Sequence, residues 1–357
     1  ILIIAYLCLG FIPNLQAVDK IAPQWVAMTS LNLISTFLFW YFRKFLTIPF
    51  SRVFASHLSI TYLLFIFWAS LSYFYSINPT EALVNITRQV NIFFMFFSYG
   101  ILFYNLRGRR FFVSWVISLI LFVETYYVLN QILELIQSTG LLSERSSLKG
   151  TAANPNITAF SIAIKIPFLI YLILYSKKNL YKLILAIVLS GSLVCISAIQ
   201  SRASYIAVLG IFIAVISLIF INKDFNSLKK KIFQTAFIII PFTISILINQ
   251  TFFASRGADL VQRAGTISIS DADVSIGSRL RYYSHVLQHI KTSPFFGVGL
   301  GNWKLKSIEY DFKDISGYVV PYHAHSDFIQ LGAELGIIGF LLYLGVYLWA
   351  LYYVYIF

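Results

Sequence analysis

An arginine and a pair of histidines stand at the ends of long apolar runs, and these residue types can hold an anion and move a proton. Arg202 follows Gln200 and Ser201 between two such runs. Its guanidinium, helped by the positive end of the helix that begins at Ala203, could clamp a phosphate group. The structural alternative is an arginine that snorkels to the membrane interface, and both interpretations stay open.

His323 and His325 lie close to Asp327, ahead of another apolar run. Histidines two residues apart diverge on a helix, and the chain has no HExxH arrangement, so we expect no metal site and no cofactor. Two interpretations of the pair remain open. One is a general base that works near neutral pH, and the other is a plain imidazole at the membrane interface.

Further polar residues lie inside apolar runs or just ahead of them. Arg88 and Lys165 fall within predicted membrane spans, where cations are candidates for substrate binding, although structural contacts would also explain them. Asn154 and Asn156 flank Pro155 ahead of another span. Helix capping is the favoured interpretation of the two asparagines, with contact to a substrate as the alternative.

Gly297, Gly299 and Gly301 have the density of glycines found in phosphate-binding loops. Such a loop needs a strand before it and a helix after it, so a plain turn is the prediction here. Glu334, close to Gly336, is interpreted first as a residue that acts at a helix end.

The elements that must position these residues follow from the composition. Of 357 residues, 59% are hydrophobic and 11% are charged, and the mean hydropathy is +0.78, whereas soluble domains carry roughly 25% charged residues. These values exclude a water-soluble globular protein. The apolar runs are continuous rather than alternating, which excludes a transmembrane barrel and predicts an all-α polytopic bundle. At least ten spans are expected, near residues 1–16, 25–42, 56–75, 83–104, 111–136, 156–176, 183–199, 203–221, 232–250 and 336–357.

The positive charge is explained by topology. A net charge of +13 would suggest a nucleic-acid partner for a soluble protein. Here about half of the basic residues lie in alternate connections, near 43–52, 107–110, 177–182 and 223–231, which the positive-inside rule places in the cytoplasm. No nucleic acid is therefore expected. Because the chain begins without Met and ends within an apolar run, we also expect a longer natural chain of about twelve spans.

One connection on the opposite side is far longer than the others, and long loops in compact proteins are usually functional. Its aromatic content and a helical pattern over 279–290 predict a folded, partly helical segment. The expected organisation is a transmembrane bundle over 1–250, a functional loop on the outer side over 251–324, and an interfacial helix followed by a final span over 325–357.

Four segments, read in order, resemble the O-antigen ligase and polymerase superfamily of polytopic bacterial glycosyltransferases. They are GTAANPN at 150–156, SRAS at 201–204, GSRL at 277–280 with the glycines that follow up to 301, and HSDF at 325–328 with its continuation to 339. Taken singly each is weak, but their order and the long loop make the series specific. The chain departs from the family at Ser326, where an asparagine is frequent.

The resemblance implies a GT-C-like membrane enzyme that transfers a glycan from polyprenyl (undecaprenyl) diphosphate to an acceptor, without a metal, at the periplasmic face of the bacterial inner membrane. An O-antigen ligase acting on lipid A core is the leading prediction. A polysaccharide polymerase and a protein O-oligosaccharyltransferase are alternatives. The resemblance makes Arg202, Arg279 and His325 the essential residues, with the arginines on the diphosphate and the histidine as base in an inverting reaction. Arg88, Arg281, His323, Asn154, Asn156 and Lys165 are the candidates for substrate binding.

A transporter or flippase for an anionic lipid is the rival class. It would use Arg88, Lys165 and Arg202 as a path across the membrane. The candidate residues gather at the outer end of the predicted bundle, and this favours catalysis over transport.

Overall fold

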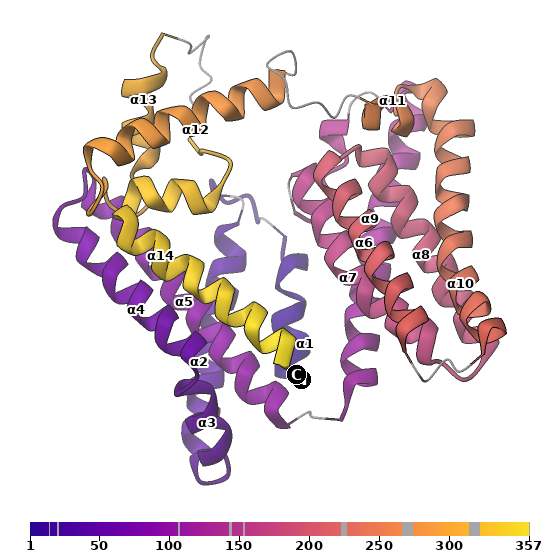
Figure 1. Cartoon of the computed structure of the whole chain (residues 1–357), viewed down its shortest axis with the longest axis horizontal. Coiled ribbons are helices and arrows are strands. Elements are labelled where there is room, and N and C mark those ends of the chain that lie inside the picture. The colour runs from indigo at the N-terminus through magenta and orange to yellow at the C-terminus, as the bar shows by residue number, and fades with distance from the viewer. Residues whose placement is uncertain are drawn as a thin grey trace. The chain divides into compact units, whose positions relative to one another are not determined.

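The computed structural model describes residues 1–13, 15–19, 21–105, 108–142, 145–152, 154–222, 227–265, 274–313 and 322–356. Every regular element in these ranges is a helix, and none of them contains a strand (Figure 1). The predicted all-α class is therefore confirmed for the described part of the chain. Two stretches of the predicted loop, 266–273 and 314–321, lie outside the described residues.

The chain forms two compact units, and each is described by itself. Apart from the first two residues, unit 1 comprises Ile3–Gln24 and Leu106–Ser268, and unit 2 comprises Trp25–Asn105 and Ile269–Phe357. Unit 1 holds most of α1 (Leu2–Leu7), the short helix η1 (Leu9–Phe11), α6 (Arg110–Thr139), η4 (Arg145–Ser147), α7 (Pro155–Tyr175), α8 (Asn179–Ile199), α9 (Arg202–Ile221), α10 (Leu228–Ile248), η5 (Asn249–Phe253), η6 (Ala254–Arg256) and α11 (Leu260–Gly265). Unit 2 holds most of α2 (Ala22–Tyr41), η2 (Arg43–Phe45), α3 (Thr47–Phe54), α4 (His57–Leu71), η3 (Ser72–Phe74), α5 (Pro79–Asn105), α12 (Val274–Thr292), α13 (Trp303–Asp311) and α14 (Asp327–Ile356).

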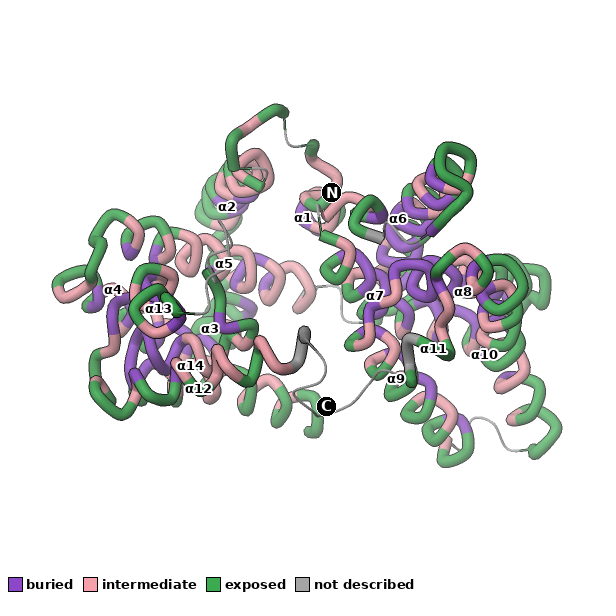
Figure 2. The backbone as a smooth tube through the Cα atoms, turned by 90° about the horizontal axis from the view of Figure 1, so that it is seen from above, coloured by how far each residue is buried: buried purple, intermediate pink, exposed green. Residues whose placement is uncertain are grey.

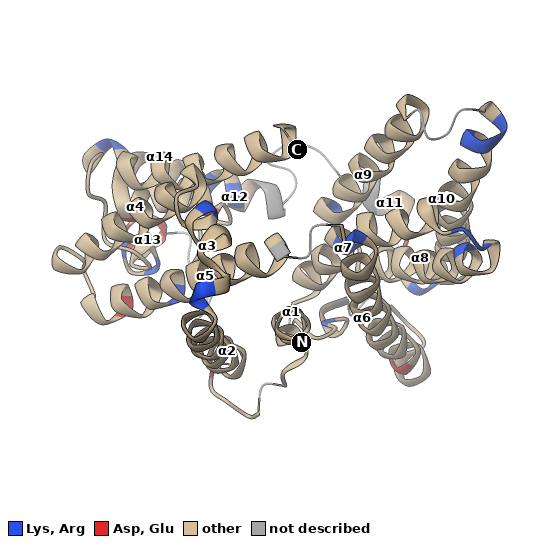
Figure 3. Cartoon of the chain, turned by 90° about the horizontal axis from the view of Figure 1, so that it is seen from below, with Lys and Arg blue, Asp and Glu red and all other residues tan. Residues whose placement is uncertain are grey.

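Eight helices in the described residues are long and apolar enough to cross a membrane, as in a multi-pass membrane protein. They correspond to the last eight of the ten predicted spans, and Figure 3 shows that charged residues occupy little of their length. In the described residues of the first predicted span, the only helices are the short α1 and η1. The second corresponds to α2, a helix of 20 residues with buried Asn32 and Ser35. Such polar residues lower its hydropathy, and Asn32 Nδ2 donates to Asn91 O at 3.0 Å.

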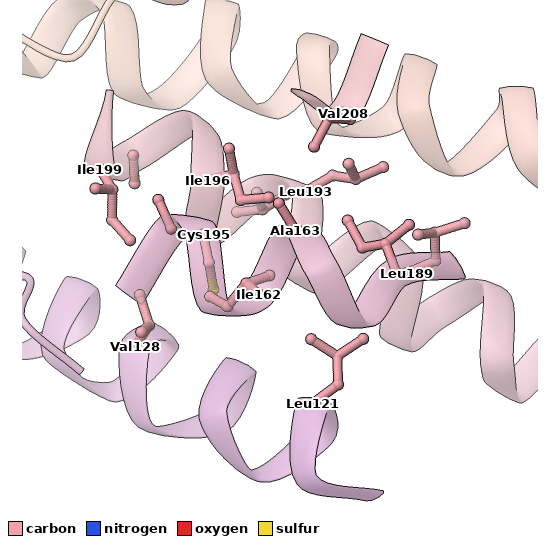
Figure 4. Close-up of a cluster of buried hydrophobic side chains, with 14 of the residues drawn as sticks. Leu121, Val128, Ile162, Ala163, Leu189, Leu193, Cys195, Ile196, Ile199 and Val208 are labelled. Carbon is pink, nitrogen blue, oxygen red and sulfur yellow. The ribbon is translucent and has the colours of Figure 1, made fainter. Parts of the chain in front are cut away.

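The core of unit 1 is built around α7 and α8, which pack against each other, against α6 and against α10. Figure 2 shows many buried residues along these helices. Ala159, Ala163 and Ala198 are completely buried, and such small residues allow the close helix packing that stabilises membrane bundles. Figure 4 shows side chains from four helices meeting in this core, among them Leu121, Val128, Ile162, Ala163, Leu189, Leu193, Cys195, Ile196, Ile199 and Val208.

In unit 2, α14 packs against α4 and, near its beginning, against α12. A small cluster beneath α12 contains Val286, Trp303, Ala324 and Ala333, each of which is at most 1% exposed. This cluster joins α12, α13 and the beginning of α14, so the segment just before α14 is anchored by packing from three elements.

Helix α14 is broken at Gly336, whose backbone angles are φ 66° and ψ −171°. The break frees carbonyl groups, and other parts of unit 2 bind them: Ala333 O accepts from Val298 N at 3.0 Å, and Leu335 O accepts from Trp68 Nε1 at 2.9 Å. An unpaired carbonyl at membrane depth would cost several kcal/mol, so these bonds make the break tolerable. The predicted final span begins at this residue.

Candidate active site

The histidine segment of unit 2 lies directly before α14. His325 has a backbone φ of 57°, the left-handed conformation that residues other than glycine seldom adopt. The Tyr282 ring on α12 stacks against the imidazole with 5.9 Å between ring centroids, and Tyr283 Oη donates to His325 O at 3.4 Å. Ala324, beside the histidine, is completely buried. Contacts from α12 and burial of the neighbouring residue therefore hold an exposed imidazole in place.

Three effects lower the pKa of His325 below its ordinary value of 6.5. Partial burial of the ring contributes most, followed by the positive charge of Arg279 and then by His323. Each effect disfavours the imidazolium form. At neutral pH the ring is therefore neutral and able to accept a proton.

A buried carboxylate organises the backbone around this segment. Glu334 is 2% exposed, and its Oε2 accepts from Gly301 N at 2.8 Å. Its Oε1 accepts from Trp303 N at 3.4 Å and from Gln330 Nε2 at 2.9 Å. Gln330 Oε1 in turn accepts from Ala324 N at 3.1 Å. A continuous chain of hydrogen bonds thus runs from the loop before α13 to the residue that precedes the candidate base.

The three glycines before α13 form a turn, as predicted. Gly297, Gly299 and Gly301 have φ values of 69°, 94° and 76°, which only glycine adopts readily. The fully buried Asn302 closes the turn, since its Oδ1 accepts from Asn78 N at 2.7 Å and its Nδ2 donates to Asn78 O at 3.3 Å. The turn is thereby tied to the segment just before α5.

The two arginines of α12 have different surroundings. Arg281 Nε lies 2.8 Å from Oδ1 of Asp311, a residue of α13 whose side chain is 2% exposed, and Arg281 Nη2 donates to Asp311 Oδ2 at 3.4 Å. His285 Nδ1 lies 3.6 Å from the same carboxylate. Arg279 is exposed and acts electrostatically on His325. Arg281 therefore joins α12 to α13, while the positive charge of Arg279 acts on the candidate base.

A cavity of about 1040 Å³ opens in unit 2, and its lining comes from α4, α5, α13, α14 and the segment before α14. Two of the predicted substrate-binding residues, Arg88 and His323, line it. The Arg88 guanidinium lies over the Trp25 ring, 5.5 Å from its centroid. Lys304 Nζ and Glu81 Oε1 form an ion pair of 2.7 Å at the cavity wall.

The remaining candidates belong to unit 1. Arg202 is the first residue of α9 and is half-buried. Asn154 is the N-cap of α7 and its Oδ1 accepts from Asn156 N at 2.9 Å, in agreement with the capping interpretation. Lys165 on α7 forms an ion pair of 2.9 Å with Glu124 on α6, and its Nζ also donates to Ser161 O at 3.0 Å.

Within unit 2 the structure brings the histidine segment and Arg279 together, with Arg88 in the cavity that His323 lines. Arg202, Asn154, Asn156 and Lys165 lie in unit 1. Sequence reasoning missed the roles of Glu334 and Gln330 and the Lys304–Glu81 ion pair. An acidic residue inside the last apolar stretch was the available signal for Glu334. Among the described residues, no group of three or more His, Cys, Asp or Glu side chains could hold a metal ion.

Part of the chain is similar to a known protein family. Residues 187–344 match the family model described as O-antigen ligase. The match begins within α8 and ends within α14, so it includes Arg202, Arg279, the glycine turn and His325. A comparison with curated proteins gives no match. Over residues 187–344, the chain is thus similar to the O-antigen ligase family, a family of glycosyltransferase-type enzymes.

Proposed function

We propose that this protein transfers a glycan from polyprenyl diphosphate to an acceptor hydroxyl at the periplasmic face of the bacterial inner membrane. An O-antigen ligase that uses lipid A core as acceptor is the leading form of the proposal. The observation that supports it best is that His325, whose pKa is lowered by partial burial and by the positive charge of Arg279, lies with that arginine within the segment that matches the family. A GT-C-like bundle belongs to the same proposal.

In the proposed reaction the acceptor oxygen attacks the anomeric carbon while its proton passes to the His325 imidazole. The bond from that carbon to the diphosphate oxygen breaks, and its electron pair leaves with the diphosphate. Arg279 stabilises the charge that grows on the leaving group. Attack in one step inverts the configuration at the anomeric carbon.

The other candidates take different places in this proposal. For Arg202, in unit 1, a phosphate contact rests on the sequence and the family match alone. Arg88 and His323 line the cavity of unit 2 and are proposed to contact substrate. Lys165, Arg281 and the two asparagines have the structural partners described above, and we propose that supporting the fold is their main role.

The test is glycan transfer by purified protein in EDTA, from a polyprenyl diphosphate glycan to lipid A core, with Arg279→Ala, Arg202→Ala and the exposed Arg109→Ala as control. Loss of a charge-assisted donor should slow transfer by about 10²-fold or more, and Arg109→Ala should match wild type. The product should show inverted anomeric configuration by NMR. Retained configuration, or full activity of Arg279→Ala, would contradict the mechanism, and lipid movement without transfer would favour a transporter.

A further inference from the structure

The cavity of unit 2 has a polar end and an apolar end along one face of α5. Glu81, Asn85, Arg88 and Gln89 line the first part of that face, and Ile92 and Phe96 continue it. These residues follow one another at spacings of one, three and four, so they share one side of the helix. A ligand that fills the whole cavity must therefore be polar at one end and apolar at the other.

The apolar end is completed by helices that cross the membrane. Leu58 of α4 and Val346 and Ala350 of α14 line it together with Phe96. Both helices are long and apolar enough to span a bilayer. The apolar end thus lies among membrane-spanning segments, where an alkyl chain is the natural occupant.

The polar end offers donors and acceptors for hydroxyl groups. Asn85 Nδ2 donates to Glu81 Oε1 at 3.0 Å, and the same carboxylate oxygen pairs with Lys304 Nζ at 2.7 Å. Tyr62 Oη donates to Gln89 Oε1 at 3.3 Å, which leaves the amide nitrogen of Gln89 as a donor. Carboxylate, ammonium and amide groups side by side match a sugar, whose hydroxyls both donate and accept hydrogen bonds.

The charge of the wall argues against a diphosphate in this cavity. The carboxylates of Glu81 and Asp327 line it together with two cations, Arg88 and Lys304. Lys304 is already paired with Glu81. A diphosphate needs a clear excess of positive charge, whereas an uncharged polyhydroxylated head does not.

We propose that this cavity binds the acceptor of the transfer reaction, with an uncharged sugar of a glycolipid at its polar end and an apolar chain of that glycolipid at its apolar end. This inference rests on the proposed function and specifies the chemical class of the acceptor substrate. His323 lines the cavity, and His325 follows two residues later. The histidine segment borders this cavity. An acceptor sugar held there by Glu81, Gln89 and Lys304 would present its hydroxyl group toward that segment.

Binding can be tested without any transfer activity. The probes are dodecyl glucoside and dodecyl phosphate, each carrying a photoreactive diazirine, applied to the full chain in nanodiscs of zwitterionic lipid. The glucoside should label peptides of α5 and α13, and excess unlabelled glucoside should compete while dodecyl phosphate should not. Equal labelling by both probes, or competition by the phosphate, would overturn the inference.

Variants sharpen this test. Glu81→Gln, Lys304→Gln and Gln89→Ala should each weaken glucoside labelling by about 3- to 10-fold, the effect of losing one hydrogen bond. Gln89→Ala keeps the Lys304–Glu81 ion pair and so covers the case in which variants of the pair fail to fold. Lys306→Gln is the matched control, because Lys306 lies on the same helix α13 and pairs with Glu309 at 2.6 Å, away from the cavity lining. Labelling that is unchanged in all three cavity variants would contradict the proposal.

Transfer kinetics separate this inference from the proposed function. Lys304→Gln should raise KM for the acceptor by a similar factor, while KM for the donor and the pH profile stay as in wild type. If wild type transfers but Lys304→Gln has an unchanged acceptor KM, the assignment of the cavity fails and the proposed function stands. If wild type transfers nothing to lipid A core, the proposed function fails, and the labelling result alone decides whether the cavity holds a sugar lipid.

Discussion

At the scale of single residues, the candidate base owes its properties to its neighbours. The side chain of His325 is only partly shielded from solvent and is held by stacking on Tyr282, and its pKa lies below the ordinary value because of this partial burial, Arg279 and His323. The types of these residues could be read from the sequence, together with the two-residue spacing of the histidines. The effect of these neighbours on the pKa could not be predicted from the sequence, because Arg279 is far from His325 along the chain and only the folded unit brings them together.

The pH profile of transfer tests the electrostatic part of this account. A base works in its deprotonated form, so activity should fall as pH drops through the pKa of His325, below 6.5. His323→Gln removes a positive neighbour, which raises that pKa and moves the acid limb of the profile upward, toward 6.5. His57→Gln, at the far end of α4 and stacked on Trp349, should leave the limb in place. A limb that stays fixed or moves downward in His323→Gln would refute this explanation.

Gln330 is expected to position the base without touching substrate at the reacting centre. Gln330→Ala removes the acceptor of the Ala324 amide and the link to Glu334, at a cost of about 1–3 kcal/mol for the buried groups left unpaired. We expect a lower kcat with nearly unchanged KM for the donor. Equal kcat in wild type and Gln330→Ala would rule out the positioning role.

At the scale of elements, the break in α14 shapes the site. Gly336 was visible in the sequence as the start of the last apolar run, yet a break in the middle of a continuous helical pattern was not. It depends on Ala333 O and Leu335 O finding partners in Val298 and Trp68. Those partners are close only after folding, so no local pattern could reveal them.

Gly336→Ala should disrupt this arrangement. Its φ of 66° disfavours any side chain, and an added Cβ would overlap the carbonyl of Phe295. The backbone conformation alone costs about 1–2 kcal/mol, and the overlap adds to it. Thermal unfolding in detergent should show a clear loss of stability. Gly210→Ala on α9 is the control, since a Cβ there meets nothing within 4 Å and Ala is favoured over Gly inside a helix. A tolerated Gly336→Ala would contradict the account of the break.

The ion pair between α6 and α7 offers a test of structural against substrate-binding roles. Lys165→Met leaves Glu124 buried without its partner at 2.9 Å and should destabilise the protein by about 3–5 kcal/mol, as breaking a buried pair does. Glu124→Gln/Lys165→Met removes both charges and should recover most of that loss. If transfer by the double variant equals that of wild type, Lys165 serves the fold. A selective rise in KM with intact stability would instead support substrate binding.

At the scale of the whole molecule, hydropathy predicted the helical class and eight of the spans that the structure supports. It overestimated the first span, whose apolar residues fall in the short helices α1 and η1. Hydropathy did not indicate that the chain forms two compact units. A membrane helix can be apolar on every side, so its sequence does not reveal which faces pack on other helices. The cavity of unit 2 escaped prediction for the same reason, since its lining comes from four helices that are distant in sequence.

The central claim is that His325 accepts the proton of the acceptor hydroxyl during glycan transfer. The most direct measurement is the rate of transfer from a polyprenyl diphosphate glycan by His325→Ala, at saturating donor and acceptor and across pH, beside wild type and His57→Ala. Loss of a general base predicts a rate lower by about 10²–10⁴-fold and the disappearance of the acid limb, with His57→Ala unchanged. A His325→Ala variant that folds, transfers at the wild-type rate and keeps the acid limb would contradict the account.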